Sequence, residues 1–457
     1  MTSSWTRAAL RLLRPALCLA LLAAPAAAQA KAAKLRANDA IGRPGRAIEL
    51  LARLQSEMAL GIGRDVSKEP IDFFLVAKDG AGLPEAKFLG TGETDGDGKA
   101  AFTWTPEGPG TWRVEARVRR GSGYVALPAP AVVAVPPPER TVIVVHLDGT
   151  ASPATNLNMF RGTDNAQLPL ADGAKLALGL LAQPYQLVYL TDLDASFGPK
   201  FRDWLALHEL PEAPVLFWEL FTKAFAHATY VEQSVARLRK DLPATVIGVG
   251  AQASDAQAFL AHGLTAIVLG SPPPAGLPDE VAVARRWEEV LGHVAMSHGV
   301  ARRLDALAGE DAAAADEALA ELALLGQPGL AYVHRHRRDG DPARAAAAAL
   351  VAGRIRASQA FLGSLDLSSA NQALAGLLAA WRAGDRAVVV ALHRDRSAGL
   401  AADVPALRSC RLVSRNEPEP GKVVYRLRLV PREGEPRERE LAFVRGDDAR
   451  WLVDAAE

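Results

Sequence analysis

Three segments that follow apolar runs carry the side chains best able to do chemistry. The run TVIVV is followed by HLDGT, which contains His146, Asp148 and Thr150. The run QLVYL is followed by Thr191, and the run ATVIGVG is followed by a segment that contains Asp255. Apolar runs of this kind are typical of strands in a parallel sheet, and ligands gather beyond the carboxyl ends of such strands. We therefore expect an imidazole, two carboxylates and two hydroxyls at one edge of a sheet, where they could hold a polar ligand or transfer protons.

In order and spacing, these segments resemble the motifs of the haloacid dehalogenase superfamily of phosphohydrolases. The family has Asp-x-Asp-Gly-Thr after its first strand, Tyr-Leu-Thr after its second and a Gly-Asn-x-x-x-Asp type motif later; here these are HLDGT, YLT and GAQASD. FRDWLALHELPEAPVLF (Phe201–Phe217) and DAQAFLAHGL (Asp255–Leu264) are also similar to the family, most closely to its lipin-type branch of phosphatidate phosphatases and phosphatidylinositol-transfer proteins. The resemblance covers about 130 residues and implies an α/β fold.

The resemblance implies a catalytic site in which two positions have changed. In the superfamily the first aspartate attacks phosphorus and the second acts as general acid/base; here His146 stands at the first position, and Asp148 keeps the second. The first aspartate also binds magnesium, which prefers hard oxygen ligands, and Ala251 replaces the asparagine or aspartate of the last motif. Only Asp255 and the Asp148 carbonyl remain as metal ligands, so we expect a weakened magnesium site and loss of most phosphoryl-transfer rate.

The phosphate-binding part of the pattern is better preserved. The resemblance assigns phosphate contacts to Thr150, Thr191 and a lysine. Lys223 is the first candidate because it follows the apolar run that ends near Phe217. Lys240 is the alternative, although its place in RLRKDLP better suits a solvated cation at a helix C-terminus.

Three functions stay open at this point. The residues favour a non-catalytic protein that binds a phosphorylated ligand, such as a phospholipid headgroup, because the nucleophilic aspartate is missing. The second is a weak phosphatase acting on phosphatidate or a phosphomonoester, with His146 forming a phospho-intermediate. The third is a structural envelope protein held by protein–protein contacts.

The other histidines offer no metal site in the sequence. His334 and His336 lie in the basic run HRHRR, where two positions apart on a helix they point to different sides, so we expect a solvated face. His293 and His298 are five residues apart, and no His or Cys pair has zinc-finger spacing.

The elements that must position the motifs form a doubly wound α/β domain over residues 140–291. The sequence predicts strands within five apolar runs, at 141–145, 186–190, 213–217, 244–250 and 265–270, and helices between them at 174–182, 197–206 and 231–240.

Three further modules flank this domain. Residues 38–138 alternate in hydrophobicity and include GETDGDGKAAFTWTPEGPGTWRVEARV, which resembles bacterial immunoglobulin-like β-sandwiches. Residues 293–365 are alanine-rich and look like one or two HEAT-type helical repeats. Residues 366–457 combine an amphipathic helix with the alternating runs LRSCRLV, KVVYRLRLV, RERELAFV and RWLVDA, similar to the α+β cone of nuclear transport factor 2.

The first thirty residues predict an exported protein. Arg7, Arg11 and Arg14 precede the apolar run PALCLALLAAPAA and the small residues AAAQA, the arrangement of a signal peptide. With this segment removed the net charge is −3, which gives no support for a nucleic-acid partner, and no later segment looks like an integral membrane span. Cys410 would then be the one cysteine left, so no internal disulfide is expected.

Overall fold

The computed structural model describes residues 30–56, 63–218, 229–338, 341–365, 367–393, 407–431, 435–446 and 448–456. The predicted signal peptide lies almost wholly outside the described residues. The chain forms two compact units, residues 1–137 and 138–457, which are described separately. None of the described helices is both long and apolar enough to cross a membrane.

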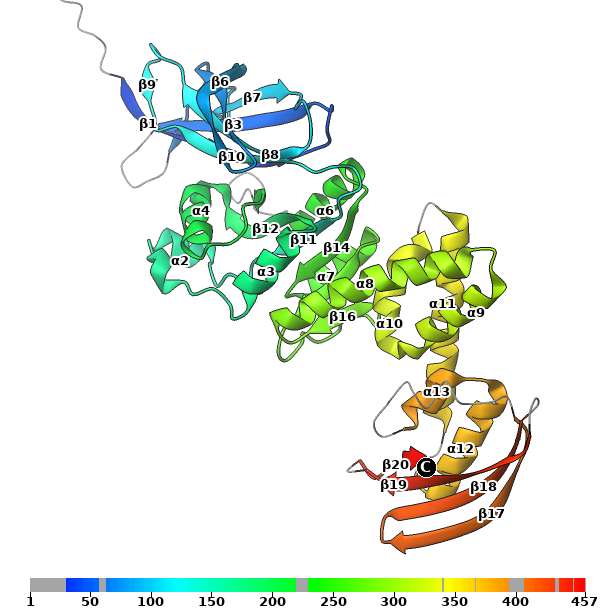
Figure 1. The fold of residues 1–457 in the computed structure, drawn as a ribbon. Coiled ribbons are helices and arrows are strands. Elements are labelled where there is room, and N and C mark those ends of the chain that lie inside the picture. The colour runs from blue at the N-terminus through cyan, green and yellow to red at the C-terminus, as the bar shows by residue number, and fades with distance from the viewer. Residues whose placement is uncertain are drawn as a thin grey trace, which may run out of the picture. The chain divides into compact units, whose positions relative to one another are not determined.

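The first unit is a sandwich of two β-sheets (Figure 1). One sheet has the order β4-β3-β1-β9, with β7 also paired to β3; the other has the order β2-β10-β8-β5-β6. Every second residue of β5 is buried, and Leu54, Phe73 and Val133 of the two sheets share one core. This confirms the predicted β-sandwich, which begins earlier than residue 38. Its strands are β1 (Lys31–Ala37), β2 (Ala40–Ile41), β3 (Ile48–Ser56), β4 (Arg64–Asp65), β5 (Pro70–Lys78), β6 (Ala81–Glu93), β7 (Lys99–Trp104), β8 (Gly110–Val118), β9 (Tyr124–Val125) and β10 (Ala129–Val135).

The second unit is built on an all-parallel sheet with the strand order β13-β12-β11-β14-β15-β16. Its first five strands overlap the five predicted apolar runs, although β12 continues four residues beyond its run, so the predicted parallel α/β sheet is confirmed. The sixth, β16, was not predicted, because four residues give too little pattern to identify a strand. The strands are β11 (Val142–His146), β12 (Gln186–Asp194), β13 (Val215–Trp218), β14 (Thr245–Gly250), β15 (Thr265–Leu269) and β16 (Val281–Ala284).

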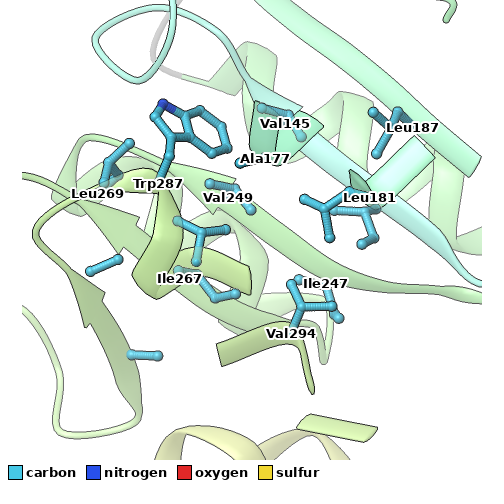
Figure 2. Packing of buried hydrophobic residues seen from close by; sticks show 14 of the residues in the cluster. Val145, Ala177, Leu181, Leu187, Ile247, Val249, Ile267, Leu269, Trp287 and Val294 are labelled. Carbon is cyan, nitrogen blue, oxygen red and sulfur yellow. The ribbon is translucent and has the colours of Figure 1, made fainter. Parts of the chain in front are cut away.

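Helices cover both faces of this sheet. Val145, Ile247 and Val249 face a layer in which α3 packs against α8, as Figure 2 shows around Leu181 and Trp287. On the other face, a Cβ on Gly248 would lie 2.4 Å from the Phe259 ring of α7, so only glycine lets this helix approach so closely. The helices are α2 (Asn156–Phe160), α3 (Ala174–Ala182), α4 (Gly198–Leu207), α6 (Tyr230–Asp241), α7 (Ala253–Ala261) and α8 (Trp287–Ala308), with 3₁₀ turns η1 (Asn165–Gln167) and η2 (Ala195–Phe197).

The helical segment shares its core with the parallel sheet. Helix α8 begins before the predicted boundary near residue 292, and its buried residues belong to the same apolar cluster as Leu330, Val351 and Ile355 of the following helices. A short helical pair cannot bury its apolar face alone, and here the α/β domain supplies the partner surface. The helices are α9 (Ala312–Leu324), α10 (Gly326–Val333) and α11 (Pro342–Ser364), with the 3₁₀ helix η4 (His334–Arg338).

The C-terminal part has a four-stranded antiparallel sheet in the order β17-β18-β19-β20, as its alternating runs predicted. Leu377 and Trp381 of α12 pack with Tyr425 and Phe443 of the sheet in a core of their own. The elements are α12 (Ala370–Ala383), α13 (Arg386–Ala391), β17 (Leu407–Glu419), β18 (Lys422–Pro431), β19 (Arg437–Arg445) and β20 (Trp451–Ala456).

Candidate functional site

The three motifs meet because their strands are neighbours. Strand β11 lies between β12 and β14, with His146 opposite Leu190 and Val145 opposite Val249. The strand order reverses between β11 and β14, which is where ligands bind in open α/β sheets. The structure therefore brings His146, Asp148, Thr191 and Asp255 to one edge of the sheet, as the sequence predicts.

The loop after β11 is held by its own residues. Gly149 has a φ of +74°, and a Cβ there would lie 3.0 Å from the Ala251 side chain, so a tight left-handed turn fits against the loop after β14. The Thr150 hydroxyl donates to the His146 carbonyl at 2.6 Å, and the Trp287 indole donates to the Thr150 carbonyl at 3.1 Å. Thr150 is 2% exposed, so the hydroxyl that was expected to contact phosphate is instead engaged in holding the loop.

The centre of the site is a group of four residues that we call the His146 ion cluster: the buried His146 and Asp255 and the half-buried Asp148 and Asp192. Nδ1 of His146 lies 2.9 Å from Oδ1 of Asp255, and both side chains are 2% exposed. Nε2 of His146 lies 3.3 Å from Oδ1 of Asp192 and 3.6 Å from Oδ2 of Asp148, as ion-pair contacts rather than aligned hydrogen bonds. Carboxylates therefore face both nitrogens of the ring.

These contacts decide the charge of the imidazole. Burial opposes protonation of His146, but the close contacts and negative charges of Asp192 and Asp255 outweigh it and raise the pKa of His146 to about 10. At neutral pH the ring is an imidazolium with a proton on each nitrogen, so neither nitrogen has a lone pair in the ring plane to offer.

Asp192 was missed by the sequence analysis. It follows Thr191 directly, but the family motif ends at the threonine, so nothing in the pattern marked the next residue. Its backbone N–H donates to Oδ2 of Asp148 at 3.0 Å, and its carboxylate faces His146.

Asp148 sits in a less favourable environment than His146. Burial and the negative charge of Asp192 raise the pKa of Asp148 to about 6. The positive charge of His146 and hydrogen bonds from the Asp192 backbone and the Thr191 side chain lower it, but they do not cancel the rise. Thr191 is fully buried, and its hydroxyl also accepts from the Leu193 N–H at 3.2 Å. Thr191 therefore supports Asp148 from within the protein.

We predict that Asp148→Asn stabilises the protein at pH 7.5. The folded-state pKa near 6 exceeds the ordinary value of 3.8, so the ionised carboxyl is disfavoured in the folded state. Asparagine keeps an oxygen for the Asp192 N–H, and the gain should be about 1–3 kcal/mol at neutral pH and vanish below pH 4. Thermal unfolding at the two pH values measures it; equal or lower stability of the variant at pH 7.5 would contradict the prediction.

Asp255 has two structural bonds besides its contact with His146. Its Oδ2 accepts from the backbone N–H groups of Ala251 and Gln252, both at 3.0 Å, and it forms a capping box with Gln252 at the start of α7. A Cβ on Gly250 would lie 2.5 Å from the Asp255 Cβ, so this glycine leaves room for the carboxylate. Both oxygens of Asp255 are thus engaged.

The residues of this site do not fit a magnesium ion. A metal would need free carboxylate oxygens, whereas those of Asp255 bind His146 and two backbone N–H groups. The imidazolium already supplies a positive charge among the carboxylates and would repel a second cation. Across the described ranges, no group of three or more His, Cys, Asp or Glu side chains is arranged to hold a metal.

A cavity of about 420 Å³ opens beside the His146 ion cluster. Its charged lining residues are His146, Asp192, Glu232 and Asp255, and Gln252, Ser254 and Gln257 provide uncharged polar groups.

Of the two predicted phosphate-facing lysines, the structure describes Lys240, which does not line this cavity. Lys223 lies outside the described residues. Lys240 is in the last turn of α6, whereas Val231 and Glu232 in the first turn line the cavity. Lys240 lies eight positions after Glu232 on this helix, which places the two residues about 12 Å apart along the helix axis.

Comparisons with known proteins show no family. The chain matches no protein-family model and no curated protein. Similar solved structures include the D0-D1 domain of intimin (22% identity, TM-score 0.16, over 22% of this chain and 46% of that one). Others are the PKD domain of an M14-like peptidase from Thermoplasmatales archaeon SCGC AB-540-F20 (15%, 0.14, over 23% and 95%) and a beta-glycosidase from Bacteroides vulgatus (11%, 0.20, over 48% and 28%). The chain thus spans less than half of the intimin fragment, and since these three TM-scores are below 0.5, the description of the fold depends on the strand pairing given above.

Proposed function

We propose that this is an exported multidomain protein whose α/β domain, related to the haloacid dehalogenase-like domains of lipin type, binds a phosphorylated ligand without hydrolysing it. The observation that carries the proposal is the His146 ion cluster, which stands where the resemblance implies a nucleophilic carboxylate. The adjacent order of β12, β11 and β14 supports the resemblance, because it brings the three motif-like segments to one edge.

A phosphohydrolase role for His146 conflicts with its protonation. Attack on phosphorus needs a lone pair on the attacking atom, and the imidazolium has none available at neutral pH. Deprotonation would remove the positive charge that lies beside the buried Asp255 carboxylate, which is costly. The same cation occupies the region where a metal would balance the carboxylates, so the site lacks the usual electrostatic support for phosphoryl transfer.

The charges around the cavity narrow the ligand class. His146 is the one positively charged residue that lines the cavity, and its charge could attract a phosphate group. Asp192, Asp255 and the exposed Glu232 add negative charge to the lining, which would repel a simple phosphate dianion. A zwitterion with a phosphate and a cationic group, as in a phosphoethanolamine headgroup, fits both signs.

We expect no phosphatase activity from the purified protein. With magnesium present, the wild-type protein should release inorganic phosphate from phosphatidate and p-nitrophenyl phosphate no faster than His146→Ala does, because the protonated ring cannot attack phosphorus. Turnover by the wild-type protein that disappears in both His146→Ala and Asp148→Asn would show an active phosphatase and overturn the non-catalytic proposal.

We expect phosphoethanolamine to bind more tightly than inorganic phosphate or ethanolamine. Titration calorimetry with the three compounds measures the order, and Glu232→Gln should weaken phosphoethanolamine about 3- to 10-fold by removing one contact for its ammonium group. Glu288→Gln, on the exposed surface of α8 and away from the cavity lining, is the matched control. Equal weak binding of all three compounds would contradict the ligand assignment.

A further inference from the structure

The cavity beside the His146 ion cluster follows helix α7 along its whole length. Its lining begins at Gln252, the N-cap of α7, and reaches Ala261, the last residue of the helix. These two positions are about 13 Å apart along the helix axis. The lining residues between them share one face of the helix, because they follow helical spacing: Ser254, Gln257, Ala258 and Ala261.

The charged part of the lining gathers at the N-terminal end of this wall. Asp255 is in the first turn of α7, where it contacts His146 at 2.9 Å, and Asp192 lies 3.3 Å from the other nitrogen of the same ring. Glu232 is in the first turn of α6. Beyond the first turn of α7, the lining residues that the structure describes are uncharged: Gln257, Ala258 and Ala261.

A phosphoethanolamine headgroup fills only part of this space. Its phosphorus and nitrogen are joined by four bonds of roughly 1.5 Å each and therefore lie about 5 Å apart. The cavity volume of about 420 Å³ is within the range of roughly 300–1,000 Å³ that is typical of sites for drug-sized molecules. The site therefore has room for a second substituent on the phosphate.

The charge of the lining also favours a phosphate with two substituents. The charged side chains around the cavity are three carboxylates and one imidazolium. A phosphomonoester carries about −1.5 to −2 charges at pH 7, so phosphoethanolamine is negative overall. A phosphodiester has a single negative charge, which the ammonium group balances, and an acidic lining repels it less.

The side chains in the uncharged part suit hydroxyl groups. Gln252, Ser254 and Gln257 are exposed, and each can both donate and accept hydrogen bonds, as neighbouring hydroxyls of a polyol require. A hydrocarbon chain would instead need large apolar side chains. Among the described lining residues, the apolar ones are no larger than Val231.

We propose that this cavity binds a phosphodiester with a cationic group on one side of the phosphate and a glycerol-type polyol on the other. The inference rests on the proposed function and deepens it by naming the second substituent. The ammonium group lies near the carboxylates of Asp192 and Glu232, and the phosphate lies on the side of His146. The polyol extends along α7, where Gln257 binds its hydroxyls.

Titration calorimetry of the full-length protein with three soluble compounds tests the inference. Glycerophosphoethanolamine should bind about tenfold more tightly than phosphoethanolamine, because it has one negative charge fewer and gains hydrogen bonds. The methyl diester of phosphoethanolamine has the same charge without the polyol and should bind with intermediate affinity. If phosphoethanolamine binds as tightly as glycerophosphoethanolamine, the proposed function stands and the diester inference is overturned. If no compound binds, both are overturned.

A competition experiment separates a soluble diester from a lipid headgroup. Both glycerol hydroxyls of phosphatidylethanolamine are esterified, so vesicles of phosphatidylcholine with phosphatidylethanolamine should compete no better than vesicles of phosphatidylcholine alone. Displacement of glycerophosphoethanolamine by the phosphatidylethanolamine vesicles would identify a lipid headgroup and overturn the polyol assignment.

Two glutamines provide matched variants. Gln257→Ala should reduce the preference for glycerophosphoethanolamine over the methyl diester about 3- to 10-fold, because a hydrogen bond to the polyol is lost. Gln233→Ala makes the same change at an exposed position of α6 that is not among the described lining residues, and it should leave this preference unchanged. Equal effects of the two variants would overturn the assignment of the polyol to α7. Both positions are exposed, and circular dichroism checks that each variant folds.

Discussion

Replacing His146 by glutamine should cost about 3–5 kcal/mol of unfolding free energy at pH 7. The imidazolium is the one cation in the His146 ion cluster, and without it the buried Asp255 carboxylate loses the positive charge that lies 2.9 Å away. Breaking a buried ion pair by removing one partner costs about this much, because the remaining charge stays desolvated. Denaturant unfolding followed by tryptophan fluorescence measures the loss, since Trp287 is buried and bonded to the loop after β11.

Two further variants separate charge from packing. His262→Gln changes a half-buried histidine at the C-terminal end of α7 for which no carboxylate contact is described, and it should cost much less. The double variant His146→Gln with Asp255→Asn removes both charges of the closest pair, and asparagine still offers an oxygen to the N–H groups of Ala251 and Gln252. It should therefore recover part of the stability. If the double variant is less stable than His146→Gln alone, the cluster is not held by charge.

The positions of the site residues followed from the sequence, but their chemistry did not. Apolar runs ending in polar residues located His146, Asp148, Thr191 and Asp255 at strand ends, and parallel strands bring such ends to one edge. The charge of His146 depends on Asp192, which a neighbouring strand supplies through its register. A linear pattern marks where a strand ends but not which side chain it faces.

The same limit applies to the domain organisation. The alanine-rich helices have an apolar face, and the sequence predicts that this face is buried but not against what. In the structure Leu330 and Ile355 join the core beneath the parallel sheet. The prediction of a solvated face for HRHRR was wrong for a related reason. This segment forms the 3₁₀ helix η4, which packs against α10 and α11 and buries His336, whereas periodicity alone would expose it.

The protein should lose stability between pH 7 and pH 10. His146 holds its proton up to a pKa of about 10 when folded but only to about 6.5 when unfolded, so the folded state binds more protons in this range. Stability falls with rising pH wherever that is so. Below pH 6.5 the protonated His146 makes its full contribution to the free energy of unfolding. The difference between the two pKa values corresponds to about 5 kcal/mol, which is lost once the pH passes 10.

The window above pH 7 isolates this effect from Asp148. The folded pKa of Asp148 is also raised, to about 6 from 3.8. The stability that its proton contributes is therefore lost as the pH rises from 3.8 to 6, and Asp148 causes no further change above pH 7. Tyr189 and Tyr230 have pKa values raised by burial and stay neutral. We therefore expect unfolding free energies of the wild type to decline from pH 7 to 10, those of Asp148→Asn to decline in parallel, and those of His146→Gln to stay nearly flat. A decline of the same steepness in His146→Gln would place the titrating group elsewhere, and the imidazolium would then not be what holds the cluster together.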